Sequence, residues 1–273
     1  MATVNEKMTA IADAIRDKTG GTDALTLDGM ATEIPKVYEA GKQAQKDEFW
    51  DKYQAGMYVN ETTGEVEGSA SRAFAGAAWN AKTFYPKHSI HPITAVGLFY
   101  YFNEGYSPMD LIARLKECNI TLDTSKVSNL AQLFFSAAVS TVPTISTVAI
   151  TGLIDRLFSG ASNLKVIEKL VLRENGTQTF NQVFQNNRSL EEIRIEGTIG
   201  GSGFDIHYST KLSRESLLSI LQACKKDNAG VTITLPLKCI DGATNTESYI
   251  SGDTELSTAL SSATAKGYTV NFD

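Results

Sequence analysis

The sequence predicts an α+β protein with three successive parts: an N-terminal helical segment (1–57), a short repeat solenoid (58–202) and a C-terminal α/β module (203–273). Three observations predict it. Apolar residues have helical spacing near the N-terminus, an apolar pattern recurs every 25 or 26 residues in the middle, and helix and strand patterns alternate at the end. With 42% hydrophobic and 21% charged residues, the 273-residue chain has the composition of a folded protein.

Helical patterns dominate the first part. Thr3 and Glu6 have the spacing of a capping box, and four apolar side chains then share one helical face: Met8, Ile11, Ala12 and Ile15. Gly20 ends this helix. A second, more polar helix is expected from Lys36 to about Ala55. Its heptad pattern fails at Glu48, so an oligomerisation stalk and a helix packed on its own chain both remain open.

A polar stretch from Gly56 to Gly68 separates this segment from the middle of the chain. It is rich in residues that favour turns. We expect a hairpin or a linker here, and the first domain boundary with it.

The repeats are anchored at Leu133, Phe158 and Phe184, which are 25 and 26 residues apart. Small, amide or branched aliphatic residues recur after the anchors at +3, +6, +9 and +11 or +12: Ser136, Val139, Val142 and Ile145; Ala161, Leu164, Ile167 and Leu170; Asn187, Leu190, Ile193 and Ile195. This period predicts a solenoid, because each unit can bury its apolar side only against its neighbours. We expect a helical turn at each anchor and a short strand after it.

Earlier copies of the repeat are eroded. Phe74 and Phe102 have the character of anchors, but polar residues, glycine or proline follow them where aliphatic residues are expected. The clear repeats therefore span 133–195, and the sequence leaves open whether 74–126 is derived from the same unit.

The C-terminal part alternates between helix and strand. Ser213 is placed to cap a helix that carries Leu217, Leu218, Ile220, Leu221 and Cys224. A strand at Val231–Leu235 ends at Pro236, and a second helix runs from about Thr254 to Lys266, with Leu256, Ala259, Leu260 and Ala263 facing inward. After Gly267, a final strand alternates at Tyr268, Val270 and Phe272. Such a module would close the open end of a solenoid.

Composition argues against several classes of function. A net charge of −6 with no run of basic residues argues against a nucleic-acid partner. No apolar stretch approaches the roughly 20 residues of a membrane span, and the polar N-terminus lacks the features of a secretory signal. We therefore expect synthesis in the cytoplasm and no membrane insertion. Three widely spaced cysteines are expected to be buried free thiols: Cys118, Cys224 and Cys239.

No motif for catalysis, a cofactor or a metal emerges. His88 and His91 lie three residues apart but have no nearby carboxylate or thiol cluster, and His207 lies in no hydrolase motif. The stretch Gly197–Gly203 lacks the Lys-Ser/Thr ending of a phosphate-binding loop, so a loop leaving the last repeat is the simpler interpretation. Glu191 and Glu192 are adjacent, which is typical of a solvated surface. We assign no catalytic, cofactor-binding or metal residues and expect a protein that is not an enzyme.

Aromatic residues concentrate in the eroded half of the repeat region: Trp79, Phe84, Tyr85, Phe99, Tyr100, Tyr101, Phe102 and Tyr106. Clusters of this kind stack on sugars or form protein interfaces. The competing interpretation is that they fill the core of this irregular half.

Three stretches carry a resemblance. The stretch Leu157–Ile167 resembles the leucine-rich repeats of the BspA type, with Gly160-Ala161 where that family often has Gly-Cys. Met8–Gly20 is similar to the opening of tail-associated proteins of phages and prophages of Gram-positive bacteria. Leu212–Ile220, Thr232–Leu235 and Ala263–Val270 resemble the closing module of the same proteins. Together the resemblances cover roughly two thirds of the chain.

The resemblance implies a short leucine-rich-repeat solenoid in a virion structural protein: a tail, baseplate or fibre component. It implies other tail or baseplate proteins as partners, a homo-oligomer such as a trimer, and a host-surface glycan or protein as receptor, with receptor-binding residues unknown. The alternative is a bacterial cell-surface adhesin of the BspA type, against which the absence of a signal and of an anchoring tail counts. A glycan-cleaving enzyme is a third class, for which no motif was found.

Overall fold

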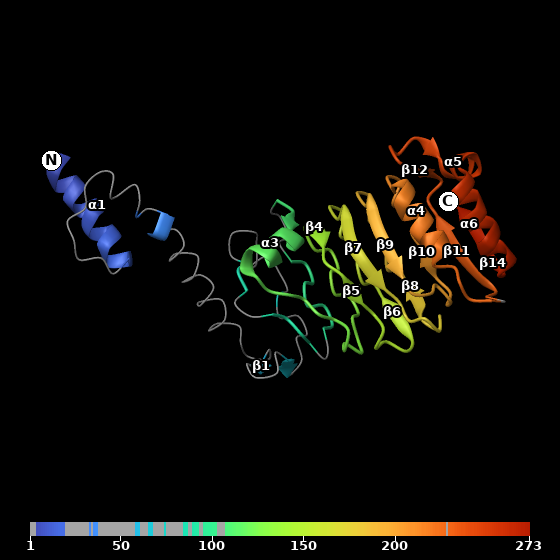
Figure 1. Ribbon diagram of the computed structural model, residues 1–273, viewed down its shortest axis with the longest axis horizontal. Helices are drawn as coiled ribbons and strands as arrows, with labels where there is room; N and C mark the ends of the chain where they lie inside the picture. The colour runs from blue at the N-terminus through green and yellow to red at the C-terminus, as the bar shows by residue number, and fades with distance from the viewer. Residues whose placement is uncertain are drawn as a thin grey trace. The chain divides into compact units, whose positions relative to one another are not determined.

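The computed structural model describes residues 4–19, 33, 35–37, 58–60, 65–67, 74, 84–86, 89–92, 95–102 and 107–273 without 228 (Figure 1). The chain divides into two compact units, Met1–Lys52 and Tyr53–Asp273. This division lies close to the expected boundary at 57, whereas the expected boundary at 202 lies inside the second unit. The fold is mixed α/β with mostly parallel strand pairing. Among the described residues, no helix has the length and apolarity to cross a membrane.

The first unit contains helix α1 (Val4–Thr19), as expected. Ala12 and Ile15 are buried, with Met8 and Val37 packed against them. Ile11 is 49% exposed, so its prediction as an inward residue was wrong. It lies on the flank of the stripe formed by Met8, Ala12 and Ile15, about 100° around the helix from Ala12. Residues 33 and 35–37 are helical, and the rest of the expected helix to Ala55 lies outside the described residues.

The second unit begins with two short antiparallel strands, β1 (Tyr58–Asn60) and β2 (Glu65–Glu67). Their pairing confirms a hairpin rather than a plain linker for this stretch.

Parallel strands stack next to one another in the middle of the second unit (Figure 1). β3 (Met109–Asp110), β4 (Val139–Val142), β7 (Val166–Val171) and β9 (Glu192–Glu196) are successive neighbours, and β5 (Ile145–Ser146) pairs with the second half of β7. The pairing aligns two buried columns: Val142, Ile167 and Ile193; Ile145, Leu170 and Ile195. Both alignments are those that the sequence period predicted.

A second set of backbone hydrogen bonds joins successive turns of the chain on the side opposite the sheet of β4, β7 and β9. β6 (Leu153–Asp155) pairs with β8 (Thr179–Asn181). Beyond these strands, Phe99 N–H donates to Leu133 O, Phe134 N–H to Leu157 O and Phe158 N–H to Val183 O, at 2.8–3.0 Å. The residues two before and two after each aromatic have positive φ: Gly97 and Tyr101, Gln132 and Ser136, Arg156 and Gly160, Gln182 and Asn186. The expected helical turn was therefore wrong. The left-handed residues turn every second N–H towards the neighbouring turn of chain.

Phenylalanine rings stack in a column inside these turns. The Phe99–Phe134, Phe134–Phe158 and Phe158–Phe184 centroids are 4.9, 5.9 and 5.8 Å apart, with interplanar angles of 10°, 10° and 18°. Phe74 packs on Phe99 at 5.2 Å. Within the described residues, the stack thus continues into the eroded half.

The column corrects three assignments. Phe134, not Leu133, is the equivalent of Phe158, and Ala137 replaces Ser136 at +3, because the link from +3 to the strand is one residue shorter in this turn than in the next. Phe99, not Phe102, is the anchor before it. The distance from Phe99 to Phe134 is 35 residues because helix α3 (Leu111–Cys118) lies between them.

The same stack explains why Asn187 occupies the +3 position, where the two preceding turns have alanine. Asn187 is fully buried where the preceding turns have Ala137 and Ala161. Its side-chain Nδ2 donates to Phe158 O at 2.8 Å and to Ala161 O at 3.0 Å, and so ties its turn to the one before it.

The C-terminal module is a parallel sheet in the order β10 (Phe204–Asp205), β11 (Val231–Leu235), β14 (Tyr268–Phe272). Helices α4 (Arg214–Gln222) and α6 (Thr254–Ala265) connect its strands, with Ser213 capping α4 and Gly267 at φ 87° after α6, as predicted. Leu256 and Ala263 are buried, while Ala259 and Leu260 are only half-buried. The sequence did not predict what lies from Pro236 to Asp253: β12 (Lys238–Cys239), β13 (Thr244–Asn245) and α5 (Thr246–Gly252).

Helix α4 closes the free edge of β9 with two serine hydroxyls. Ile193 N–H donates to Ser216 Oγ at 2.9 Å, and Ile195 N–H donates to Ser219 Oγ at 2.7 Å. The serine hydroxyls in turn donate to Glu191 O and Ile195 O. The helix therefore satisfies the backbone groups that a further strand would pair.

We predict that Ser216→Ala and Ser219→Ala each lower the free energy of unfolding by about 1–3 kcal/mol, because each leaves a strand N–H without its acceptor. Urea unfolding measures this effect. Ser262→Ala, on the exposed surface of α6, is the control and should change the free energy by less than about 0.5 kcal/mol. Equal unfolding midpoints for all three variants would contradict this role of the hydroxyls.

The glycine-rich stretch Gly197–Gly203 is a loop that leaves β9, as interpreted. Close packing requires its glycines. A Cβ on Gly200 would lie 2.2 Å from Gly176 O, and one on Gly203 would lie 2.0 Å from Phe180 O. Tyr268 of β14 donates its hydroxyl to Ile199 O in this loop. The loop is thus pressed between the stack and the C-terminal sheet.

We predict that Gly200→Ala lowers the free energy of unfolding by about 1–3 kcal/mol, since backbone must shift to admit the methyl group. Gly252→Ala is the matched control, because a Cβ there meets nothing within 4 Å. The control should be neutral or stabilising by up to about 1 kcal/mol. Thermal or urea unfolding would show the difference, and equal effects of the two changes would refute the packing explanation.

Candidate functional site

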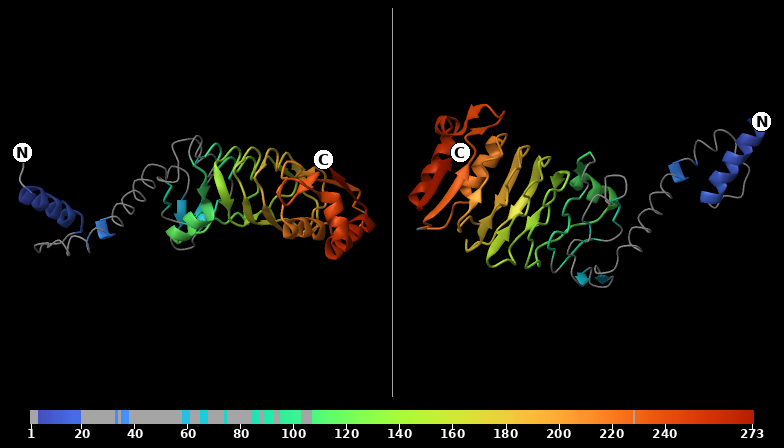
Figure 2. Two further views of the ribbon diagram at one scale, coloured as in Figure 1. Left: turned by 90° about the horizontal axis from the view of Figure 1, so that it is seen from above. Right: turned by 180° about the vertical axis from the view of Figure 1, so that it is seen from behind.

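A groove of about 750 Å³ lies on the solvent-facing side of β7 and β9, between α3 and α4. It is lined by Ile112 of α3, by Val166 and Glu168 of β7, by Glu192 and Arg194 of β9, and by the N-cap and exposed side of α4 between Ser213 and Gln222. In Figures 1 and 2 the strands β4, β7 and β9 lie side by side between these two helices. We refer to this hollow as the sheet groove.

The floor of the sheet groove follows from strand alternation. In β9, Ile193 and Ile195 are buried while Glu192, Arg194 and Glu196 face solvent. The parallel pairing of β9 with β7 sets Val166 opposite Glu192. The period of two in Glu192–Glu196 was visible in the sequence, but the neighbouring helices were needed to make this face a groove.

The α3 wall is fastened to the sheet by a polar contact between turns. Asp110 caps α3 by accepting from Ala113 N–H at 2.9 Å. Thr141 of β4 donates to Asp110 Oδ1 at 2.6 Å and accepts from Ile112 N–H at 3.1 Å. Farther along the helix, Arg114 donates to Phe84 O at 2.6 Å and lies over the Tyr85 ring at 3.9 Å.

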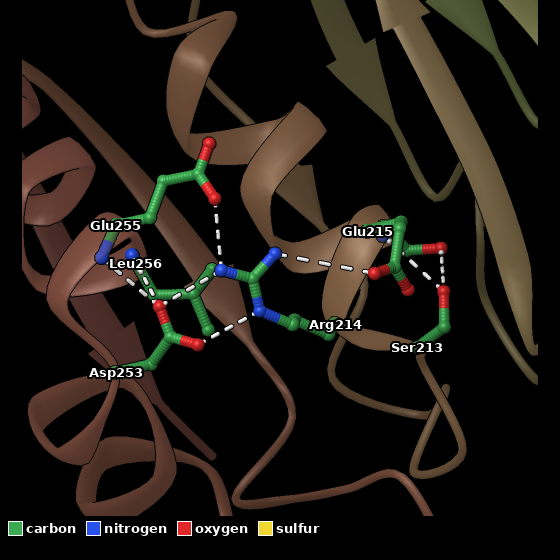
Figure 3. A network of polar contacts seen from close by, with 7 residues as sticks. Ser213, Arg214, Glu215, Asp253, Glu255 and Leu256 are labelled. Carbon is green, nitrogen blue, oxygen red and sulfur yellow. Dashed lines mark hydrogen bonds and ion pairs between the residues drawn. The ribbon is translucent and has the colours of Figure 1, made fainter.

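The α4 wall is held by an arginine that joins it to α6 (Figure 3). Arg214 Nε and an Arg214 terminal nitrogen donate to the two oxygens of Asp253 at 2.7 and 3.0 Å, and the same terminal nitrogen donates to Glu255 at 2.8 Å. Asp253 also caps α6, accepting from Glu255 N–H and Leu256 N–H at 3.0 Å. The position of α4 beside the groove therefore depends on this ion-paired network.

The charges inside the sheet groove are only partly compensated. Glu168 accepts from Thr144 N–H and hydroxyl at 3.0 and 3.1 Å, and Glu215 is 3.9 Å from Arg214, which is already engaged elsewhere. The side chains of Glu192 and Arg194 make no hydrogen bond or ion pair with the described residues. Beside the groove, Lys169 bonds to Glu196 at 2.8 Å, and this hydrogen bond lowers the pKa of Glu196.

This arrangement can bind by three means. Aliphatic side chains on the floor and both walls offer apolar contact, three carboxylates and one guanidinium offer ion pairs, and hydroxyl and amide groups of α4 offer hydrogen bonds. A volume of about 750 Å³ is in the range of ligand-binding clefts.

Each histidine within the described residues lies near a single carboxylate. His88 lies outside them. His91 is 3.5 Å from Asp123, and His207 Nδ1 is 2.7 Å from Asp205 Oδ1 within one turn. Burial raises the pKa of Asp123, but the hydrogen bonds from Ser125 and the proximity of His91 outweigh it and lower the pKa overall. No group of three potential metal ligands occurs in the described part of the chain.

The aromatic cluster divides into core and surface. Phe84, Phe99 and Phe102 are fully buried and pack edge-to-face around one another, which confirms the core interpretation for these rings. Tyr100 and Tyr101 are half-buried and contact Phe135, with the Tyr100 ring stacked on it at 5.1 Å. Trp79 and Tyr106 lie outside the described residues.

The remaining candidates have ordinary surroundings. Cys224 and Cys239 are buried free thiols, as expected, whereas Cys118 is partly exposed. Burial raises the pKa of Cys224 to about 12. Of the adjacent glutamates, Glu191 lies 3.8 Å from Lys165 on the surface, as interpreted, but Glu192 lines the sheet groove, which the sequence did not reveal.

No protein-family model matches this sequence, and neither a search of curated proteins nor a search of solved structures returns a significant match.

We predict that Asp253→Asn destabilises the protein at neutral pH and that this difference narrows as the pH falls to 2.5. The hydrogen bond from Arg214, followed by that from Leu256 N–H, lowers the pKa of Asp253 from 3.8 to about 2. A lowered folded-state pKa contributes stability above about pH 4 that is lost as the pH falls towards 2. Asparagine keeps an oxygen for the cap but removes the charge together with the acceptor of Arg214 Nε.

Urea midpoints of the wild type and Asp253→Asn at pH 6, 4 and 2.5 measure this convergence. Glu174→Gln, at an exposed residue of a turn, is the control with the same loss of charge. A gap between Asp253→Asn and the wild type that stays constant over this range would refute the assignment.

Proposed function

We propose that this chain is a non-enzymatic structural protein of a phage or prophage virion, a component of its tail, baseplate or fibre. Its middle part is a leucine-rich-repeat solenoid of the BspA type. The N-terminal helical segment attaches the protein to the particle or joins copies of it into an oligomer, such as a trimer. The sheet groove is the face that meets a host-surface molecule.

The repeat part of the proposal is supported by the stacked turns. Phe134, Phe158 and Phe184 follow one another after 24 and 26 residues, within the length range of leucine-rich repeats. Each turn contributes a short parallel strand to a shared sheet and buries branched aliphatic residues against its neighbours. Solenoids of this kind commonly bind their partners on an extended surface of the stack.

The observation that carries the virion assignment is the resemblance of both flanking stretches to phage tail-associated proteins. Met8–Gly20 falls mostly on α1, with two inward-facing residues in its middle. The stretches that resemble the closing module form α4, β11, the end of α6 and β14, which together seal the end of the stack. A terminal module of this kind is needed because a solenoid otherwise exposes its last apolar face.

Mass spectrometry of particles purified through a density gradient tests the assignment. We expect peptides of this chain in the particle fraction, in a constant ratio to a tail-tube protein. Immunogold labelling with an antibody against residues 107–273 should then decorate one end of the particle. Recovery of the chain only in the host cell-wall fraction, with none in particles, would overturn the proposal in favour of a cell-surface adhesin.

A further inference from the structure

The sheet groove has the dimensions of a single extended chain. Its floor is formed by two neighbouring strands, β7 and β9, which lie one strand spacing of about 4.8 Å apart. The floor residues, 166–168 of β7 and 192–195 of β9, extend for about 10–13 Å along the strands at about 3.3 Å per residue. A helix with its side chains is about 10–12 Å across, wider than this strand spacing, so an extended segment of three or four residues matches the floor more closely.

The free charges of the groove favour a cationic partner. Among the described residues that line it, Glu168, Glu192 and Glu215 are anionic and only Arg194 is cationic. Glu192 has no partner within the described residues, and the nearest cation to Glu215 is 3.9 Å away and engaged with Asp253. A basic side chain would thus find carboxylates that the protein itself leaves uncompensated, whereas an acidic ligand would be repelled.

The apolar lining favours a peptide over a glycan. Ile112 and Leu218 face the groove from opposite walls, and Val166 lies on the floor. Sugar rings are usually held by aromatic faces, and the described lining contains none. Aliphatic side chains between cationic ones match this lining, and Arg194 and Gln222 can donate to the carbonyl groups of an extended backbone.

We propose that the sheet groove binds an extended peptide segment of a partner protein in which basic and aliphatic side chains alternate. This inference rests on the proposed function in so far as it names the chemistry of the surface partner. The binding itself is a property of the groove, and it can be measured without the particle.

Fluorescence anisotropy on the full chain tests the proposal with a labelled Lys-Val-Lys-Val-Lys-Val peptide and a matched Glu-Val-Glu-Val-Glu-Val peptide. We expect saturable binding of the lysine peptide only, weakening as salt rises from 50 to 300 mM. The double variant Glu192→Gln/Glu215→Gln should weaken binding by about tenfold, in keeping with the loss of two partly exposed ion pairs. Leu218→Ser should weaken it without changing the salt dependence.

A charge-matched control separates the groove from general acidity. Glu174→Gln/Glu247→Gln removes the same charge at exposed residues away from the groove and should leave affinity within about twofold. Circular dichroism checks that every variant is folded. Equal losses for both double variants, no binding of the lysine peptide, or binding of a neutral oligosaccharide in its place would each overturn the proposal. None of these outcomes changes whether the chain is found in purified particles, so the two proposals fail separately.

Discussion

The central part of this structure depends on the backbone hydrogen bonds that pass from each turn of chain to the next. On one side they join parallel strands, and on the other they come from every second N–H around the stacked phenylalanines. The second set requires left-handed residues two positions before and two after each ring, and four successive turns supply them with Gly, Gln, Arg, Tyr, Ser or Asn. Since most of these are not glycine, the conformational cost at each must be met by the bonds and the packing that the turn makes.

Such a stack needs an end, and α4 provides it without another strand. Ser216 and Ser219 satisfy the backbone of β9, and Arg214, one residue after the cap of the same helix, ties it to α6. The last strand therefore has no free edge along Ile193 and Ile195 that would invite pairing with another chain. Loss of the Asp253 charge would loosen the helix that covers this edge.

The sheet groove is a consequence of where helices are inserted in the stack. α3 lies beside β3, and α4 lies beside β9. The turns that carry β4 and β7 contribute only strands to this face. The face between the helices is thus recessed, and its exposed positions are filled by charged residues of β7 and β9. The groove arises from the difference between turns rather than from their repetition.

Much of the fold could be read from the sequence because its signals are local or periodic. The aligned columns through Ile167 and Leu170, the cap at Ser213 and the strand at Val231–Leu235 each follow from spacing or from one residue type, and all are confirmed. The conformation around the rings, the ring column through Phe99 and Phe134, and the role of Glu192 were decided only by tertiary structure. A link one residue shorter and an inserted helix break the period without changing the packing, and a groove depends on elements that are far apart in the chain.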